Sequence, residues 1–297
     1  ADLALGTNTA DLCSPACAPG EPAPMDRGRV SQVLLGENLR VFAVDGERAR
    51  VEAVEQAHFS SGAWGGYAGW VPAAALATPA PAMKPDAVVS STATQSFGRT
   101  PDGVFKRRLP MGARVMRLRP AGEPEGAGLE GVRLFDGTQA SIAKGALFSP
   151  PAAVDNERRD AILGAALQLL GRRYLWCGRS AVQTLEGTAV DCSGLISLAY
   201  RVAGVDTPRD AHDQFLKAVR LDRAGKPGDL MFLSKTGRPE LINHVALVGN
   251  GETLIESVEE AGVRETTFSK RLGKTRGQIK SGDQVNGRTV YFGAYIP

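Results

Sequence analysis

Cys192 is a residue that could do chemistry, because it lies in the run Asp191-Cys192-Ser193-Gly194. The next residues predict a helix, since their apolar positions recur with helical spacing: Leu195, Ile196, Leu198, Ala199 and Val202. A thiol at a helix N-terminus meets unpaired backbone N–H groups and the positive end of the helix dipole, and both favour the thiolate. We therefore expect Cys192 to be a nucleophile, whereas an average cysteine is a small buried hydrophobic residue.

Three histidines could serve as the base for such a cysteine: His58, His212 and His244. His58 lies in a stretch rich in Gly and Ser, and His212 lies near a predicted helix start after Pro208. His244 opens an apolar run that is typical of a strand. We favour His244, whose imidazole could accept the thiol proton.

The partner of His244 depends on the hairpin that follows it. A three-residue loop, Gly249-Asn250-Gly251, would pair Val248 with Glu252 and so place His244 directly opposite Glu256. A carboxylate there would orient the imidazole and favour its charged form. A two-residue Asn250-Gly251 turn would instead put both side chains on opposite faces, and Glu256 would then be an exposed strand carboxylate.

Two segments rich in predicted strands precede this part of the chain. Residues 30–71 contain candidate strands at 33–35, 39–44 and 49–54, separated by Gly-containing turns. Residues 73–85 are rich in Ala and Pro without periodicity, which predicts a linker. A second β segment covers about 88–148, with strands at 114–118 and 131–135 and turns at Pro101-Asp102-Gly103, around Glu123 and at Asp136-Gly137.

The pattern changes after Ser149-Pro150-Pro151. Asp155 is placed to cap a helix whose apolar positions have helical spacing. The helix after Cys192 follows, and then come predicted strands at 230–233, 244–248, 253–257 and 289–292. Helices followed by a sheet indicate an α+β domain.

Composition excludes several classes of protein. The 297 residues carry 35 basic and 32 acidic side chains, and Lys106-Arg107-Arg108 is the only dense basic cluster, so we expect no nucleic-acid partner. No stretch is long and apolar enough to predict a membrane span. The cysteine spacing does not fit a zinc site, and we expect neither a metal nor another cofactor. Cys13 and Cys17 are either a small-loop disulfide or two incidental thiols.

The motifs together resemble the NlpC/P60 peptidase family in order and spacing from about Asp155 to Pro297. They are Tyr174-Leu175-Trp176-Cys177-Gly178-Arg179-Ser180, Asp191-Cys192-Ser193-Gly194-Leu195, Pro208-Arg209-Asp210, Gly228-Asp229-Leu230 and His244-Val245. The runs 30–37 and 66–71 resemble bacterial SH3 (SH3b) domains, and the second β segment does so loosely. The resemblance implies a multidomain protein: two small all-β SH3-like barrels, over residues 1–80 with an N-terminal extension and 86–150, then an α+β papain-like cysteine peptidase domain over 151–297.

The resemblance also implies catalytic roles. Cys192 attacks, His244 accepts its proton, and Tyr174 helps to hold the oxyanion. Glu256 takes the place of the third residue, where relatives more often carry His, Asn or Gln. Cys177 replaces the first glycine of the usual Trp-Gly-Gly run.

The implied substrate is a peptidoglycan stem peptide or muropeptide with a free N-terminal L-Ala, cut between γ-D-Glu and the diamino acid. Asp210, aided by Ser193, would meet the L-Ala amine, since a cation needs a fixed anion. Tyr67 and Glu37 would close that end of the cleft from the first β domain. The remaining expected substrate contacts are Asp191 and Trp176, whereas Arg209 is expected to form a structural ion pair.

Two other functions stay open: an inactive peptidase-fold module that binds cell-wall peptides, and a thiol acyltransferase on the same scaffold. The acyltransferase would need a broad apolar groove in place of Asp210. We expect a monomer that acts in the periplasm or outside the cell, with the cytoplasm as the alternative.

Overall fold

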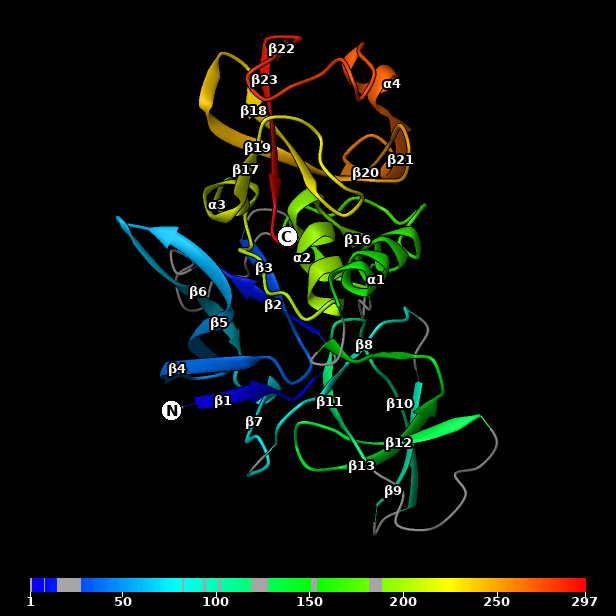
Figure 1. Ribbon diagram of the computed structural model, residues 1–297. Coiled ribbons are helices and arrows are strands. Elements are labelled where there is room, and N and C mark those ends of the chain that lie inside the picture. Colours follow the sequence, from blue (N-terminus) through cyan, green and yellow to red (C-terminus); the bar gives the residue numbers. More distant parts are fainter. Residues whose placement is uncertain are drawn as a thin grey trace.

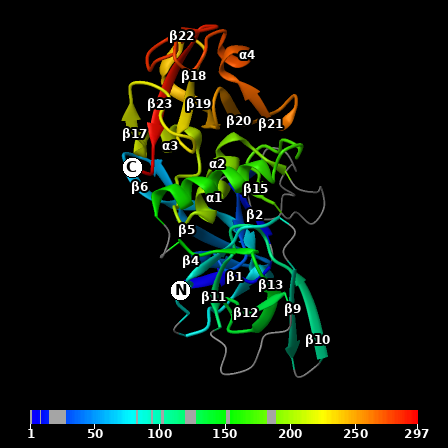
Figure 2. The same ribbon diagram turned by 45° about the vertical axis from the view of Figure 1, so that its right-hand side comes forward.

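The computed structural model describes residues 2–7, 9–14, 28–81, 83–92, 95–100, 103–118, 128–150, 154–181 and 189–297, with the backbone alone for 2, 95–100 and 103–107 (Figure 1). Within these residues the chain forms three seven-stranded sheets with antiparallel pairing, two before residue 150 and one after it. Helices α1 (Asp155–Leu167) and α2 (Cys192–Val202) lie between the third sheet and the other two (Figures 1 and 2). The β-rich first half and the α+β second half agree with the sequence patterns.

The first sheet has the strand order β3-β2-β6-β5-β4-β1-β7. Its strands are β1 (Asp2–Leu5), β2 (Thr9–Cys13), β3 (Arg29–Leu34), β4 (Asn38–Asp45), β5 (Arg48–Ser60), β6 (Ala63–Pro72) and β7 (Leu76–Ala77), with the short 3-10 helix η1 (Ala73–Ala75) before β7. The predicted strands at 39–44 and 49–54 are confirmed inside β4 and β5. The predicted linker at 73–85 is wrong in its first part, because Leu76 pairs with Leu5 of β1 and completes the sheet.

The second sheet has the order β10-β9-β13-β12-β11-β8-β14. Its strands are β8 (Ala87–Val89), β9 (Gln95–Thr100), β10 (Gly103–Arg108), β11 (Arg114–Arg117), β12 (Leu129–Arg133), β13 (Gln139–Ala143) and β14 (Leu147–Phe148). Val115, Val132 and Ile142 are almost completely buried in its core. Pro101, Asp102 and the predicted turn around Glu123 lie outside the described residues, as does Cys17.

The third sheet has the order β17-β23-β18-β19-β20-β21, and β22 pairs with β23. Its strands are β17 (Val219–Leu221), β18 (Leu230–Lys235), β19 (Arg238–Val248), β20 (Thr253–Val258), β21 (Gly262–Thr267), β22 (Gln284–Val285) and β23 (Arg288–Ala294). Helices α3 (Ala211–Lys217) and α4 (Phe268–Leu272) and the two-stranded sheet of β15 (Arg179–Ser180) and β16 (Ala189–Val190) complete this part. All four predicted strands are confirmed within longer ones.

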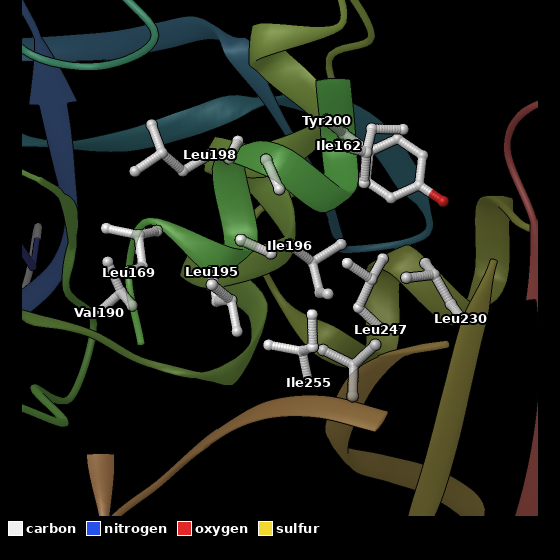
Figure 3. Close-up of a cluster of buried hydrophobic side chains, with 14 of the residues drawn as sticks. Ile162, Leu169, Val190, Leu195, Ile196, Leu198, Tyr200, Leu230, Leu247 and Ile255 are labelled. Carbon is white, nitrogen blue, oxygen red and sulfur yellow. The ribbon is translucent and has the colours of Figure 1, made fainter. Parts of the chain in front are cut away.

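Helix α2 is buried along its whole length, as a helix that is apolar on nearly all sides should be. Leu195 and Ile196 belong to one buried cluster with Ile162 of α1 and with Leu247 and Ile255 of the third sheet (Figure 3). Each such side chain contributes about 1.5–3 kcal/mol by leaving water. This packing fixes the start of α2, and therefore Cys192, against the sheet.

The start of α1 differs from the expectation by one residue. Asp155 is the first helical residue, and Val154 is the N-cap. The backbone N–H of Val154 donates to Glu157 Oε2 at 3.0 Å, so a first-turn carboxylate replaces the missing cap side chain. In the described part of the chain, no helix has the length and hydropathy needed to cross a membrane.

Candidate active site

Cys192 is the first residue of α2, and Asp191 is its N-cap with an extended backbone. Asp191 Oδ1 accepts the backbone N–H of Gly194 at 2.6 Å and the hydroxyl of Ser193 at 3.2 Å. A side chain at Gly194 would not fit, because its Cβ would lie 2.0 Å from the carbonyl oxygen of Gly178. The run Asp191–Gly194 therefore forms a tightly packed helix start, and the thiol belongs to the first helical residue.

Helix α2 packs against β19, and Cys192 and Val245 belong to the same buried cluster. Val245 directly follows His244, so the thiol lies against the strand that carries the imidazole. Burial, followed by the charge of Asp191, raises the pKa of Cys192 to about 12, and backbone N–H groups and Arg209 only partly oppose this rise. Desolvation of the sulfur therefore works against the thiolate that the helix start favours.

His244 and Glu256 meet, although by a different register from the predicted one. The strand pairing is Leu247 with Ile255 and Val248 with Leu254, so the loop is two residues longer than expected. With this offset Glu256 lies diagonal to His244 rather than opposite it. Because side chains alternate with a period of two, the shift keeps both on one face. His244 Nε2 lies 2.7 Å from Glu256 Oε2.

Glu256 is completely buried and holds two further cations. Arg264 Nη2 lies 2.7 Å from Glu256 Oε1, and Arg271 Nε lies 3.0 Å from Glu256 Oε2. Burial would raise the pKa of Glu256, but its hydrogen bonds with His244 and Arg264 and the charge of Arg271 lower it to about 2. Burial lowers the pKa of His244 below its usual value despite Glu256. A neutral imidazole beside a fixed carboxylate is suited to accept a proton.

Tyr174 lies in the segment before β15 and is half-buried. Burial and the charge of Asp191 raise its pKa, so the phenol stays protonated. Trp176, two residues later, is 63% exposed. Cys177 adopts a left-handed backbone with φ of 59°, a conformation that glycine adopts without strain.

Asp210 and Tyr67 come together although 143 residues separate them. The Tyr67 hydroxyl donates to Asp210 Oδ2 at 3.0 Å, and the Asp210 side chain is 40% exposed. His58 stacks on the Tyr67 ring at 4.4 Å, and its Nδ1 lies 2.8 Å from Asp213 Oδ2. The sequence did not predict a role for His58 or Asp213 beside Asp210, because no local motif links a strand of the first sheet to α3.

The hydrogen bond to Asp213 raises the pKa of His58, and burial opposes this rise. Ligand atoms of His58, Asp210 and Asp213 lie within 4.8 Å of one another, the spacing at which a metal ion could bind. His58 Nδ1 is already hydrogen-bonded to Asp213, however, and the backbone N–H of Phe59 donates to the same carboxylate oxygen at 2.9 Å. These bonds explain the group as an interface between the first sheet and α3.

Three expected substrate contacts are engaged within the protein. Glu37 is completely buried, where it accepts from Arg179 Nη1 at 2.8 Å and from the backbone N–H of Leu34 at 2.9 Å. Asp191 binds Arg209 through both oxygens, at 3.1 and 2.8 Å. Arg209 also donates to the Ser193 hydroxyl at 2.9 Å. The assignment of Glu37 to the cleft is corrected, because its carboxylate holds the first sheet to β15 instead.

Arg209 connects the nucleophile to the first sheet. It is almost completely buried, and it donates from Nε to the Ser31 hydroxyl at 3.0 Å and from its backbone N–H to the carbonyl of Ala57 at 3.1 Å. A buried guanidinium needs this full set of partners. The expected structural ion pair of Arg209 is therefore present, with Asp191 as the anion.

Comparisons with known proteins agree with this geometry. Residues 171–279 match the NlpC/P60 family. The chain is 32% identical over 94 residues to the bifunctional muramidase/DL-endopeptidase CwlT of Bacillus subtilis, covering 31% of this chain and 27% of that protein. It is 28% identical over 127 residues to the gamma-D-glutamyl-L-lysine dipeptidyl-peptidase of Bacillus cereus, covering 41% and 36%. The chain therefore spans well under two thirds of these relatives.

A crystal structure of an NlpC/P60 family protein from Bacillus cereus shares the fold along the full length of both chains, with a TM-score of 0.76 and 19% identity. This likeness extends to the two N-terminal sheets as well as to the part with Cys192. At 19% identity, this likeness shows a shared fold and nothing about activity.

Proposed function

We propose that this chain, which carries an NlpC/P60 domain at residues 171–279, is a cysteine endopeptidase that hydrolyses peptidoglycan stem peptides. One observation supports it most. Cys192 begins a buried helix that packs against β19, and on that strand His244 is held by the buried carboxylate of Glu256. Nucleophile, base and orienting group thus come from three elements that converge on one point.

In the proposed reaction His244 takes the proton of Cys192, and the sulfur attacks the γ-carbonyl of D-Glu. Tyr174 and backbone N–H groups donate to the oxyanion. The C–N bond then breaks, protonated His244 gives its proton to the leaving amine, and a thioester remains. Water, deprotonated by His244, hydrolyses the thioester and restores the thiol. Because the resting thiol has a raised pKa, proton transfer accompanies the attack rather than preceding it.

We propose that the amine of an N-terminal L-Ala binds Asp210. This carboxylate is part-exposed, and Tyr67 fixes its orientation. A relative named a gamma-D-glutamyl-L-lysine dipeptidyl-peptidase supports cleavage after an N-terminal dipeptide. Ser193 and Asp191 position this subsite through Arg209, and the exposed Trp176 contacts the peptide.

The remaining assignments belong to the same proposal. We propose that the two N-terminal sheets are SH3b-like domains over 1–80 and 86–150, and that residues 151–297 form a papain-like catalytic domain. A monomer acting outside the cytoplasm fits a cell-wall substrate, in keeping with relatives named as a DL-endopeptidase and a probable endopeptidase p60.

A cell-wall peptide-binding module without activity is the second candidate. The observation that favours it is the burial of the Cys192 side chain, because desolvation raises the pKa of the thiol. A catalytic thiol usually has a lowered pKa. The two functions differ in whether the chain turns over its ligand.

Incubation with L-Ala-γ-D-Glu-L-Lys tests the proposal, with Cys192→Ala as the control. We expect wild type to release L-Ala-D-Glu and the variant to release none. An N-acetylated peptide should be cleaved far more slowly, because it lacks the charge that Asp210 binds. Tight binding of the peptide by wild type without any cleavage would establish the second candidate instead.

A further inference from the structure

Cations outnumber anions around the His244–Glu256 pair. Arg264 and Arg271 both form their ion pairs with Glu256, which also holds His244. One carboxylate therefore serves two guanidinium groups and an imidazole. A third arginine, Arg288, lies at the start of β23 in the same region.

Arg288 has neutral partners. Its Nε donates to the carbonyl oxygen of Ser234 at 2.7 Å, and Nη2 donates to Asn243 Oδ1. None of the ion pairs among the described residues includes Arg288. These bonds orient the guanidinium without neutralising it, so a positive charge is fixed in a half-buried position.

The location of Arg288 links it to the reaction. Asn243, which accepts from its Nη2, directly precedes His244. Burial and then the charge of Arg271 lower the pKa of Arg288, whereas the charges of Cys192 and Glu256 raise it. The bond to Asn243 therefore places the guanidinium beside the segment of β19 that carries His244.

We propose that Arg288 binds a carboxylate of the substrate next to the scissile bond, on the leaving-group side. This inference rests on the proposed function and extends it to the diamino acid. The amine end of the substrate is assigned to Asp210, the N-cap of α3, and to Tyr67 on β6. Arg288 lies in the β22–β23 hairpin, which both views place at the opposite end of the third sheet from β6 (Figures 1 and 2). A peptide that extends past Cys192 from Asp210 would therefore carry its leaving half toward Arg288.

The substrate offers two carboxylates near the cleaved bond: that of the diamino acid and the α-carboxylate of D-Glu. The direction just described favours the diamino acid. A fixed guanidinium binds a carboxylate through charge-assisted, commonly paired hydrogen bonds. Arg271, whose anion is shared with Arg264, adds positive potential behind the subsite.

Three peptides show which of the two carboxylates Arg288 binds. They are L-Ala-γ-D-Glu-L-Lys as the free acid, the same peptide with a C-terminal amide, and a form with the D-Glu α-carboxylate amidated. We expect wild type to prefer the free acid over the C-terminal amide by about ten- to hundredfold in kcat/KM. Arg288→Gln should remove this preference by slowing cleavage of the free acid alone, and Arg288→Lys should restore part of it. If only the D-Glu amide abolishes the Arg288 effect, the leaving-group placement is overturned.

Arg238→Gln is the matched control. Arg238 is 61% exposed on β19 and pairs with Glu240, so its loss changes the net charge equally and leaves the hydrogen bonds of Arg288 in place. Equal slowing of all three peptides by Arg288→Gln would overturn the inference, because a structural role affects every substrate. Thermal unfolding of each variant confirms folding.

Two outcomes of the cleavage assay distinguish failure of the carboxylate subsite from failure of the proposed function. If wild type cleaves all three peptides equally and Cys192→Ala cleaves none, the peptidase stands and the carboxylate subsite fails. If wild type cleaves none of them, the proposed function fails and the subsite fails with it.

Discussion

Glu256→Gln should remove a large, pH-dependent part of the stability. Glu256 is completely buried, and its pKa is lowered from 4.5 to about 2 by His244 and two arginines. At about 1.36 kcal/mol per pKa unit, this shift corresponds to about 3 kcal/mol of stability. The independent figure for removing one partner of a buried ion pair is about 3–5 kcal/mol. Arg264 and Arg271 are 39% and 24% exposed and can regain water, so we expect the lower end.

The sign of the pH dependence follows from the direction of the shift. A carboxyl whose folded pKa is lowered stabilises the protein above its unfolded pKa, and this contribution disappears as the pH falls toward the folded value. The difference in unfolding free energy between wild type and Glu256→Gln should therefore be about 3 kcal/mol at pH 7 and shrink steadily between about pH 5 and pH 2.

Urea unfolding of both proteins at several pH values measures this difference, and other carboxyl groups cancel because both proteins contain them. Glu240→Gln is the matched control. Glu240 is 67% exposed on the same strand as His244, and its pair with Arg238 contributes at most about 1 kcal/mol. A difference for Glu256→Gln that stays constant from pH 7 to pH 3 would refute the reasoning, because Glu256 would then not be the titrating group.

Three further predictions concern the cleft. Alkylation of Cys192 by iodoacetamide without substrate should be slow at pH 7 and still rise above pH 9, since burial raises its pKa to about 12; a plateau near pH 7 would contradict this. Asp210→Asn should raise KM for free-amine peptides about ten- to hundredfold without slowing N-acetylated ones, and steady-state kinetics on both peptides decides. Cys177→Gly should raise the melting temperature by a few degrees, because glycine relieves roughly 1 kcal/mol of strain at a φ of 59°; an unchanged or lower value would exclude strain.

The sequence predicted the local features of the site well. Asp191 to Gly194 form a helix start because each residue acts on its near neighbours, and these interactions can be read from spacing. The pairing of His244 with Glu256 was also predicted, although the loop has a different length. It was correct because contact in a sheet depends first on which face a residue occupies, and an even shift preserves the face.

The parts that the sequence did not predict depend on contacts between distant segments. Glu37 was placed in the cleft, but it is buried against Arg179, which is 142 residues away. His58 and Asp213 were not assigned at all. The sign of the Cys192 pKa shift also needs the structure, since the helix N-terminus is visible in the sequence and the depth of burial is not.

These distant contacts explain why the first sheet is part of the proposed site. Ser31 and the carbonyl of Ala57 bind Arg209, whose guanidinium holds the cap of α2 through Asp191. Tyr67 orients Asp210 from the same sheet. Three strands of this sheet, β3, β5 and β6, thus support both the helix start that carries the nucleophile and the anion assigned to the substrate amine. A shift of this sheet would therefore change substrate preference and thiol position together, which couples recognition of the free amine to the geometry of the cleavage step.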